Sequence, residues 1–433
     1  MAKAQPTAFL DARLVDPDRG YDGPGAIIVS EGVIADVIRR PRFDDLSSDV
    51  RVIDCGGAML APGLVDLRVK TGEPGAEPKE TLKSVSRAAA AGGVTSIVIQ
   101  PDTDPAIDDP AMVDFILRRG RGLDGVNLYP AGAATRGCKG EKLAELGLMR
   151  DAGAVYFTDV DQPIADSKLL RRVMSYAKGF GAAVAHRPAD PWLSAGAVAT
   201  EGEFAARMGL ASAPAVAERI MLERDLALAE LTGAHLIVDQ ITTADALDSL
   251  KRAKDRGVRV SATASINHLS FNELDIGDYR TFARLDPPLR AEADRQALIE
   301  ALLSGLVEVV TSAHAPAPAE DKRLPFSEAT PGGVGLETLL PALLTLHYEG
   351  GADLLTLIRA VTLAPARLIG LDAGRIAPGA AADLVLCDLG APFRVDADKL
   401  LSKSKNSPFD GRRLQGVVIL TMVGGRVVHR AEA

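Results

Sequence analysis

The sequence predicts an α/β protein in which a (β/α)8 TIM barrel carries a small β-sandwich domain formed by the N- and C-terminal segments. Short apolar runs alternate with helical stretches through the middle of the chain, and both ends are rich in β-branched residues and glycine turns. The 433 residues suffice for a barrel of roughly 250–300 residues and a smaller domain. We expect residues 1–60 and 371–433 to form the two parts of the β-sandwich and residues 61–370 the barrel.

Each end of the chain predicts a set of short strands. Ala26 to Ile38 contains two apolar runs joined by Ser-Glu-Gly, which is typical of a hairpin, and Arg51 to Leu60 adds a run with a Gly-Gly turn. Near the other end, the runs GVVILTMV and RVVHR are separated by Gly424 and Gly425. We therefore expect the two ends to meet in one small sheet domain.

The middle of the chain repeats a strand-then-helix pattern. The apolar runs are GLVDLRV, SIVIQP, AVYFTD, AAVAHR, HLIVDQ, RVSATA and VEVVTSAH. Helical stretches such as KETLKSVSRAAAAGG, DSKLLRRVMSYAKGFG, TADALDSLKRAKDRG and DRQALIEALLSG lie between them. Seven or eight such units fit a closed parallel barrel, whose chemistry lies where strands end and loops begin. Residues 402–413 are the most loop-like stretch.

Composition excludes several classes of function. The formal net charge of −9 argues against binding of nucleic acid or an anionic membrane, because both require basic surfaces. We find no run of about 18 apolar residues that could span a membrane. The three cysteines form no CxxC pair, so we expect a reduced, cytoplasmic setting.

Several strand ends carry motifs of a known family. APGLVDLRVKTGEPG (Ala61 to Gly75) resembles PGLVDxHxHxREPG, the opening of dihydroorotases. RAAAAGGVTSIVIQPDTDP resembles their next strand, which ends in a Pro-Asn-Thr-Asn-Pro turn. EGEFAARMGL, AERIMLERDLALAELTGAHL, DPPLR, AHAP and NSPFDGRRLQGVV follow in order, so the resemblance runs from about residue 8 to residue 430. It implies the amidohydrolase barrel and the terminal β-sandwich.

The resemblance also implies a metal-dependent reaction whose ligands are mostly missing from this chain. Dihydroorotases open or close a cyclic amide, and two zinc ions that share a hydroxide supply the nucleophile and the Lewis acid. The family's ligands align with a degenerate set in which only one position still carries a histidine: Arg68, Lys70, Val160, His186, Gln240 and Ala313. We expect no catalytic residue and no cofactor; a rebuilt metal site would use His186, Asp159 and His314.

The substrate side of the family site is also changed. Gly72 aligns with the arginine that would bind a substrate carboxylate, and Asp102 and Asp286 align with asparagines. These changes would repel an anion such as dihydroorotate. We expect Arg68 and Lys70 to pair with Asp102, Asp159 or Asp286 and to fill the space of the metals. Tyr156 and Trp192 are expected to serve packing.

The resemblance implies a role for a catalytically degenerate chain of this type. Such dihydroorotase-like proteins are partners of the aspartate transcarbamoylase catalytic subunit, so we expect a non-catalytic subunit that supports its assembly in pyrimidine biosynthesis, itself a homodimer. The alternative is an active dihydroorotase, or a related cyclic-amide hydrolase with an altered metal site that accepts a cationic or neutral ring. A third hypothesis is a small-molecule sensor that keeps the pocket.

Overall fold

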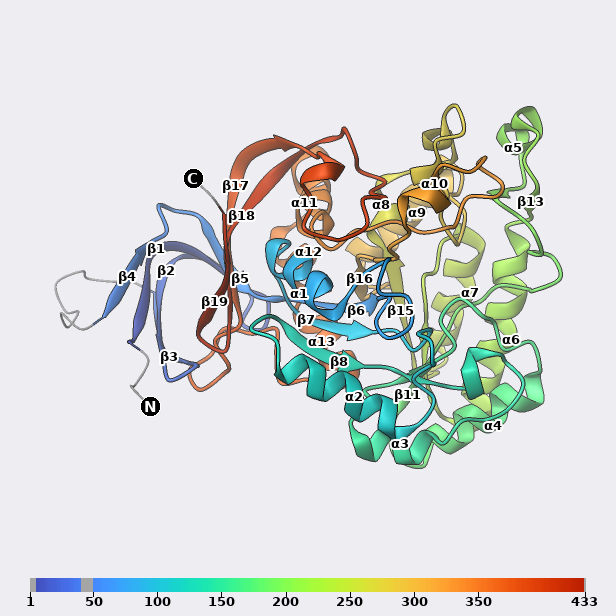
Figure 1. Cartoon of the computed structure of the whole chain (residues 1–433), viewed down its shortest axis with the longest axis horizontal. Coiled ribbons are helices and arrows are strands. Elements are labelled where there is room, and N and C mark those ends of the chain that lie inside the picture. Colours follow the sequence, from blue (N-terminus) through green and yellow to red (C-terminus); the bar gives the residue numbers. More distant parts are fainter. Residues whose placement is uncertain (1–4, 40–49, 432–433) are drawn as a thin grey trace.

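The computed structural model describes residues 5–39 and 50–431. Figure 1 shows a barrel flanked on one side by a sheet domain to which both termini lead. In the described part of the chain, no helix is long and apolar enough to cross a membrane.

The sheet domain combines strands from both ends of the chain. Its strand order is β19-β18-β17-β5-β1-β2-β3, with β4 paired to β1. The joint between the two ends is the antiparallel pairing of β5 with β17, which aligns Leu60 with Leu386. The predicted meeting of the ends is therefore confirmed. The strands are β1 (Thr7–Asp16), β2 (Tyr21–Ser30), β3 (Val33–Ile38), β4 (Arg51–Asp54), β5 (Met59–Pro62), β17 (Leu384–Arg394), β18 (Arg413–Val423) and β19 (Arg426–Arg430).

The barrel strands are parallel, as predicted. They are β6 (Leu64–Val69), β7 (Val94–Ile99), β8 (Asn127–Pro130) continued by β9 (Gly132–Ala133), β10 (Phe157–Thr158), β11 (Ala183–His186), β14 (His235–Val238), β15 (Val260–Ser265) and β16 (Val309–Thr311). The last strand returns to the first through the parallel bridge between Val69 and His314. The Lys70 amide donates to the His314 carbonyl oxygen at 2.9 Å, which closes the ring beside the site described below.

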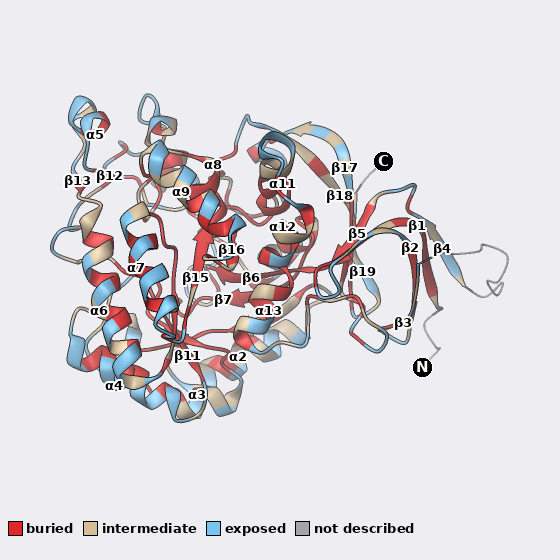
Figure 2. Ribbon diagram, turned by 180° about the vertical axis from the view of Figure 1, so that it is seen from behind, coloured by how far each residue is buried: buried red, intermediate tan, exposed pale blue. Residues whose placement is uncertain are grey.

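Amphipathic helices cover the barrel. α4 buries Leu169, Leu170, Val173 and Ala177 on one face, and Asp166 caps its first turn. Figure 2 shows buried residues along the barrel strands and on the inward faces of the helices. The helices of eight or more residues are α1 (Leu82–Ala91), α2 (Pro110–Arg121), α4 (Ser167–Lys178), α6 (Val216–Thr232), α7 (Ala244–Asp255), α9 (Glu292–Leu303), α11 (Leu339–Gly350) and α12 (Leu354–Val361).

Shorter elements lie mainly in the loops. They are α3 (Leu146–Ala152), α5 (Glu203–Met208), α8 (Ile266–Ser270), α10 (Ala319–Lys322), α13 (Leu363–Ile369), β12 (Ala199–Thr200), β13 (Ser212–Ala213), η2 (Arg136–Cys138), η3 (Glu273–Ile276), η4 (Thr281–Ala283) and η5 (Ala397–Lys399).

A segment between β17 and β18, residues 400–410, connects the sheet domain to the barrel mouth. We call it the strap. Its Asn406 amide donates to the carbonyl oxygens of Ala315 at 3.1 Å and Gly332 at 3.0 Å, and accepts from the Ala317 amide at 3.1 Å. The predicted loop is therefore irregular in backbone but firmly held.

Candidate active site at the carboxyl ends of the barrel strands

Three of the expected ligand positions share an unusual backbone conformation. Val160, Gln240 and Ala313 have φ of 58°, 58° and 49°, a left-handed region that non-glycine residues rarely adopt. Threonine hydroxyls of the preceding or adjacent strand support two of them: Thr158 Oγ1 accepts from the Val160 amide at 3.0 Å, and Thr263 Oγ1 from the Gln240 amide at 3.0 Å. Such strain of about 1–3 kcal/mol per residue is typical of functional sites.

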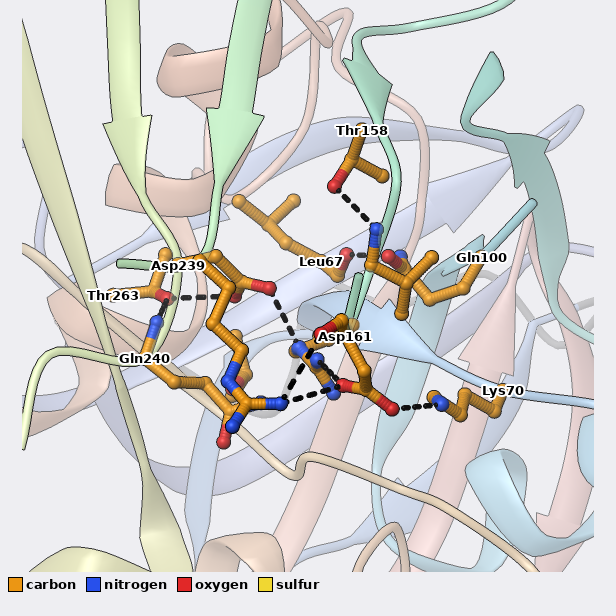
Figure 3. Close-up of polar contacts among 12 residues, drawn as sticks. Leu67, Lys70, Gln100, Thr158, Asp161, Asp239, Gln240 and Thr263 are labelled. Carbon is orange, nitrogen blue, oxygen red and sulfur yellow. Dashed lines mark hydrogen bonds and ion pairs between the residues drawn. The ribbon is translucent and has the colours of Figure 1, made fainter. Parts of the chain in front are cut away.

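Arg68 and Lys70 form a network of ion pairs with Asp102, Asp161 and Asp239, which we call the strand-end cluster. Figure 3 shows Lys70, Asp161 and Asp239 of this cluster. Arg68 Nη2 lies 2.6 Å from Asp161 Oδ1, and Arg68 Nε lies 2.8 Å from Asp239 Oδ2. Lys70 Nζ lies 2.7 Å from Asp102 Oδ2 and also pairs with Asp161. Asp161 thus bridges both cations, and the cluster ties together loops that follow four different strands.

The cluster keeps its members charged. Burial opposes the ionised forms, but the carboxylates of Asp239 and Asp161 outweigh it and raise the pKa of Arg68. Asp102 and Asp161 likewise raise the pKa of Lys70 against its burial. In turn, Lys70 and Arg68 overcome burial and hold the pKa of Asp161 well below its usual range.

Gln240 completes the surroundings of Arg68. In the amide orientation that satisfies both of its ends, its oxygen accepts from Arg68 Nε at 2.7 Å and from Nη1 at 2.8 Å. Gln240, at the position expected for a histidine ligand, therefore binds the guanidinium of Arg68.

The pairing predicted for Asp159 and Asp286 is wrong. Asp159 accepts from the Thr135 amide at 2.9 Å and from the Thr135 hydroxyl, because its side chain turns toward the loop after β9. Burial raises the pKa of Asp159 despite these hydrogen bonds. Asp286 pairs with Arg187, whose Nη1 lies 2.7 Å from Asp286 Oδ2. The predicted pairing of Lys70 with Asp102 is confirmed.

The surviving histidines do not converge on the cluster. His186 uses both ring nitrogens: Nδ1 lies 2.6 Å from Asp225 Oδ2, and Nε2 accepts from the Ile164 amide at 2.8 Å. His314 is fully buried with Nε2 3.6 Å from Glu80 Oε2. The structure therefore does not bring His186, Asp159 and His314 together as one ligand set: over residues 5–39 and 50–431, no group of three or more His, Cys, Asp or Glu side chains could hold a metal ion.

The substrate side of the site is closed. A Cβ at Gly72 would lie 1.9 Å from the Ala76 carbonyl oxygen, so the loop leaves no room there for an arginine. The cavity lined by Arg68, Gln240 and Asp286 has a volume of about 30 Å³. That volume admits a water molecule or two, whereas small-molecule pockets measure roughly 300–1,000 Å³.

Three functional side chains were missed at the sequence level: Asp161, Arg187 and Asp239. Each is one residue away from a position that the resemblance singled out, since Asp161 follows Val160, Arg187 follows His186 and Asp239 precedes Gln240. The charged residue next to each singled-out strand-end position was the feature of the sequence from which these three side chains could have been predicted. The expectation that Trp192 serves packing is also wrong, because 75% of this residue is exposed; Tyr156 is buried as expected.

An eight-stranded barrel with a strand-end site and a sheet domain built from both termini is the architecture of an amidohydrolase. Residues 57–246 match the family model described as Dihydro-orotase-like, and residues 346–429 match that of the Amidohydrolase family. The chain is 39% identical over 425 residues to a protein named Dihydroorotase from Anaeromyxobacter dehalogenans, covering 97% of both chains. A similarly named protein from Anaplasma phagocytophilum is 39% identical over 430 residues, covering 98% of this chain and 95% of that protein.

Solved structures agree. The L-hydantoinase (dihydropyrimidinase) from Arthrobacter aurescens superimposes with a TM-score of 0.86 at 26% identity, covering 98% of this chain and 96% of that one. The protein belongs to the dihydroorotase family, within the amidohydrolases.

These relationships contradict the expectation that the chain uses no cofactor. Dihydroorotases and hydantoinases are metal-dependent amidohydrolases, so similarity to them points to a metal cofactor, zinc. The side chains at Arg68 and Lys70 do not fit such a metal, since neither a guanidinium nor an ammonium has a lone pair to donate. The relatives therefore indicate a zinc cofactor, whereas the side chains of Arg68 and Lys70 cannot serve as its ligands.

Proposed function

We propose that this member of the dihydroorotase family is a non-catalytic subunit that supports assembly of aspartate transcarbamoylase in pyrimidine biosynthesis. The observation that carries the proposal is the strand-end cluster, in which Arg68 and Lys70 are held by Asp161, Asp239 and Asp102. These side chains are paired with one another at strand ends where the family carries metal ligands.

Substrate binding is opposed independently of the cluster. Dihydroorotate is an anion, and the loop around Gly72 has no space for a cationic side chain. Arg187 is bound through two hydrogen bonds to Asp286, a residue that lines the closed cavity. A substrate carboxylate would have to displace a carboxylate that is covalently part of the protein.

Binding to a partner protein requires only the intact fold and its surface. The fold extends over 98% of its length in the comparison with the hydantoinase, although the pocket is closed. Surface loops on an intact barrel can bind a partner without any chemistry in the pocket. Binding of this kind stabilises the partner by mass action on the bound form.

The second candidate function is an active dihydroorotase or a related cyclic-amide hydrolase. The comparisons favour it over the non-catalytic role, because relatives that are 39% identical over 97% of the chain carry the name Dihydroorotase. This candidate requires the Arg187–Asp286 pair to open and the strand-end cluster to rearrange when substrate binds.

Mixing experiments test the proposed role. The purified chain and aspartate transcarbamoylase from the same organism are combined at micromolar concentration, and the mass of the eluting species is measured by light scattering. We expect one discrete complex in which the transcarbamoylase is more active or melts at a higher temperature. Separate elution of the two proteins would remove the basis for the role.

A further inference from the structure

A second concave site lies at the opposite end of the barrel from the strand-end cluster. It is a cleft of about 440 Å³. His235 and Val309, the first residues of β14 and β16, line it, whereas Asp239 and Ala313 follow the ends of the same two strands in the site described above. The cleft is therefore separated from the cluster by the length of the barrel, and its volume lies in the range of small-molecule pockets.

The walls of the cleft are largely apolar. Leu302, Val307 and Val309 line one side, and Ala360, Leu363 and Ala364 of α12 and α13 line the other. Figure 2 shows β16 between α9 and α12. Apolar surface of this kind gains roughly 25 cal/mol for each Å² that a ligand removes from water.

The lining of the cleft includes one neutral polar pair, His235 and Ser261. His235 Nε2 lies 3.1 Å from Ser261 Oγ, and both residues line the cleft. Burial, and secondarily Arg259, lowers the pKa of His235 to about 4, so its imidazole is uncharged at neutral pH. This pair can accept or donate one hydrogen bond but offers no counterion to a cation.

Two arginines also line the cleft. Arg359 and Arg367 both line the cleft; Arg359 Nη2 donates to the Pro17 carbonyl oxygen at 2.6 Å, and Arg367 Nη2 pairs with Asp18 at 2.6 Å. These are single contacts on guanidinium groups that each have five N–H donors. The acidic residue of the lining, Glu308, is engaged by Lys254 and by the Ala262 amide.

We propose that this cleft binds an amphipathic carboxylate, with an apolar chain or ring between β16 and α12–α13 and the acid group at Arg359 and Arg367. The apolar walls account for the body of the ligand, and the two arginines select an anionic head over a cationic or neutral one. This inference is independent of the proposed role with aspartate transcarbamoylase.

Calorimetric titration with octanoate, and with 1-octanol as its uncharged counterpart, tests the proposal. We expect octanoate to bind with one site per chain and at least about fivefold more tightly than octanol. The double variant Arg359→Gln/Arg367→Gln should lose about tenfold in octanoate affinity and leave octanol binding unchanged. The matched control is Arg171→Gln/Arg172→Gln, two exposed arginines of α4, which should bind octanoate like the unmodified chain.

A second variant keeps the test decisive if the arginine changes disturb the fold. Ala364→Trp places a large side chain in the half-buried lining of the cleft and should abolish binding of both ligands without changing the circular dichroism spectrum. Octanoate binding that survives Ala364→Trp, or no binding by the unmodified chain up to millimolar concentration, would overturn the proposal. Coverage of the cleft by a second copy, seen as a dimer by light scattering and as absence of octanoate binding, would also overturn it.

Discussion

The carboxylate of Asp161 binds two cations at once, Arg68 and Lys70. Arg68 is almost fully buried, with its side chain 4% exposed, whereas the side chain of Asp161 is 35% exposed. Removal of one partner from a buried ion pair leaves an uncompensated charge, which is costlier than the pair is favourable. Asp161 is the carboxylate that both cations share, so the stability of the cluster depends on it.

Asp161→Asn should therefore destabilise the protein. We expect a loss of about 2–3 kcal/mol in the free energy of unfolding, below the range for fully buried pairs because Asp161 is partly solvated. Urea denaturation followed by circular dichroism measures it. The control Asp255→Asn removes an exposed i,i+4 pair with Lys251 and should cost about 0.5 kcal/mol or less. Equal losses in the two variants would contradict the central place given to Asp161.

The difference in the free energy of unfolding between the unmodified chain and Asp161→Asn should stay constant between about pH 5 and pH 9. The pKa of Asp161 is depressed in the fold, so its stabilisation is complete above its unfolded pKa and is lost only as pH falls toward the folded pKa. The pKa of Lys70 is raised, so its stabilisation is complete below its unfolded pKa and is lost only as pH rises toward the folded pKa. Unfolding measured at each pH tests this, and a steep change near neutrality would contradict it.

At the scale of elements, alternation of apolar runs and helices was sufficient to predict the barrel. The strand β8 (Asn127–Pro130) with β9 was not among the predicted runs, because NLYP is short and interrupted by polar and proline residues. Its place is fixed by pairing with β7, which aligns Ile97 with Leu128. Tertiary pairing thus determines a strand that local pattern leaves ambiguous.

The partners of Arg68 show why the site was harder to predict than the fold. Asp161 and Asp239 lie 93 and 171 residues away from it in sequence. They become its neighbours because parallel strands bring their carboxyl ends to one rim. The family resemblance identified the positions at the rim, but the choice between adjacent carboxylates, such as Asp159 and Asp161, depends on which side chain the turn directs inward.

The strap offers a prediction at this scale. Asn406 connects Ala315, Ala317 and Gly332 in the loop that follows β16, so Asn406→Ala should loosen that loop. We expect amide hydrogen exchange to accelerate by about tenfold or more within residues 313–333, because buried backbone groups lose partners. The control Asp398→Ala lies on the exposed side of the same connection, in η5. Unchanged exchange in Asn406→Ala would show that the loop is held by other contacts.

At the scale of the whole molecule, the fold matches that of a related enzyme, whereas the cavity at the strand ends is too small for a substrate. The barrel and terminal sheet match a hydantoinase with a TM-score of 0.86, yet the cavity at the strand ends has a volume of only about 30 Å³. A rearrangement large enough to admit dihydroorotate must separate Arg187 from Asp286. It must also break some of the ion pairs of the strand-end cluster. We therefore expect that the intact chain does not turn over dihydroorotate.

The most direct test is a dihydroorotase assay in both directions on the full chain, with zinc supplied, after purification from a host that lacks its own dihydroorotase. We expect no turnover above that of the buffer alone, while an active dihydroorotase assayed in parallel turns over its substrate normally. A kcat/KM of about 10⁴ M⁻¹s⁻¹ or more, in the range of ordinary enzymes, would overturn the non-catalytic role and establish the chain as an active member of its family.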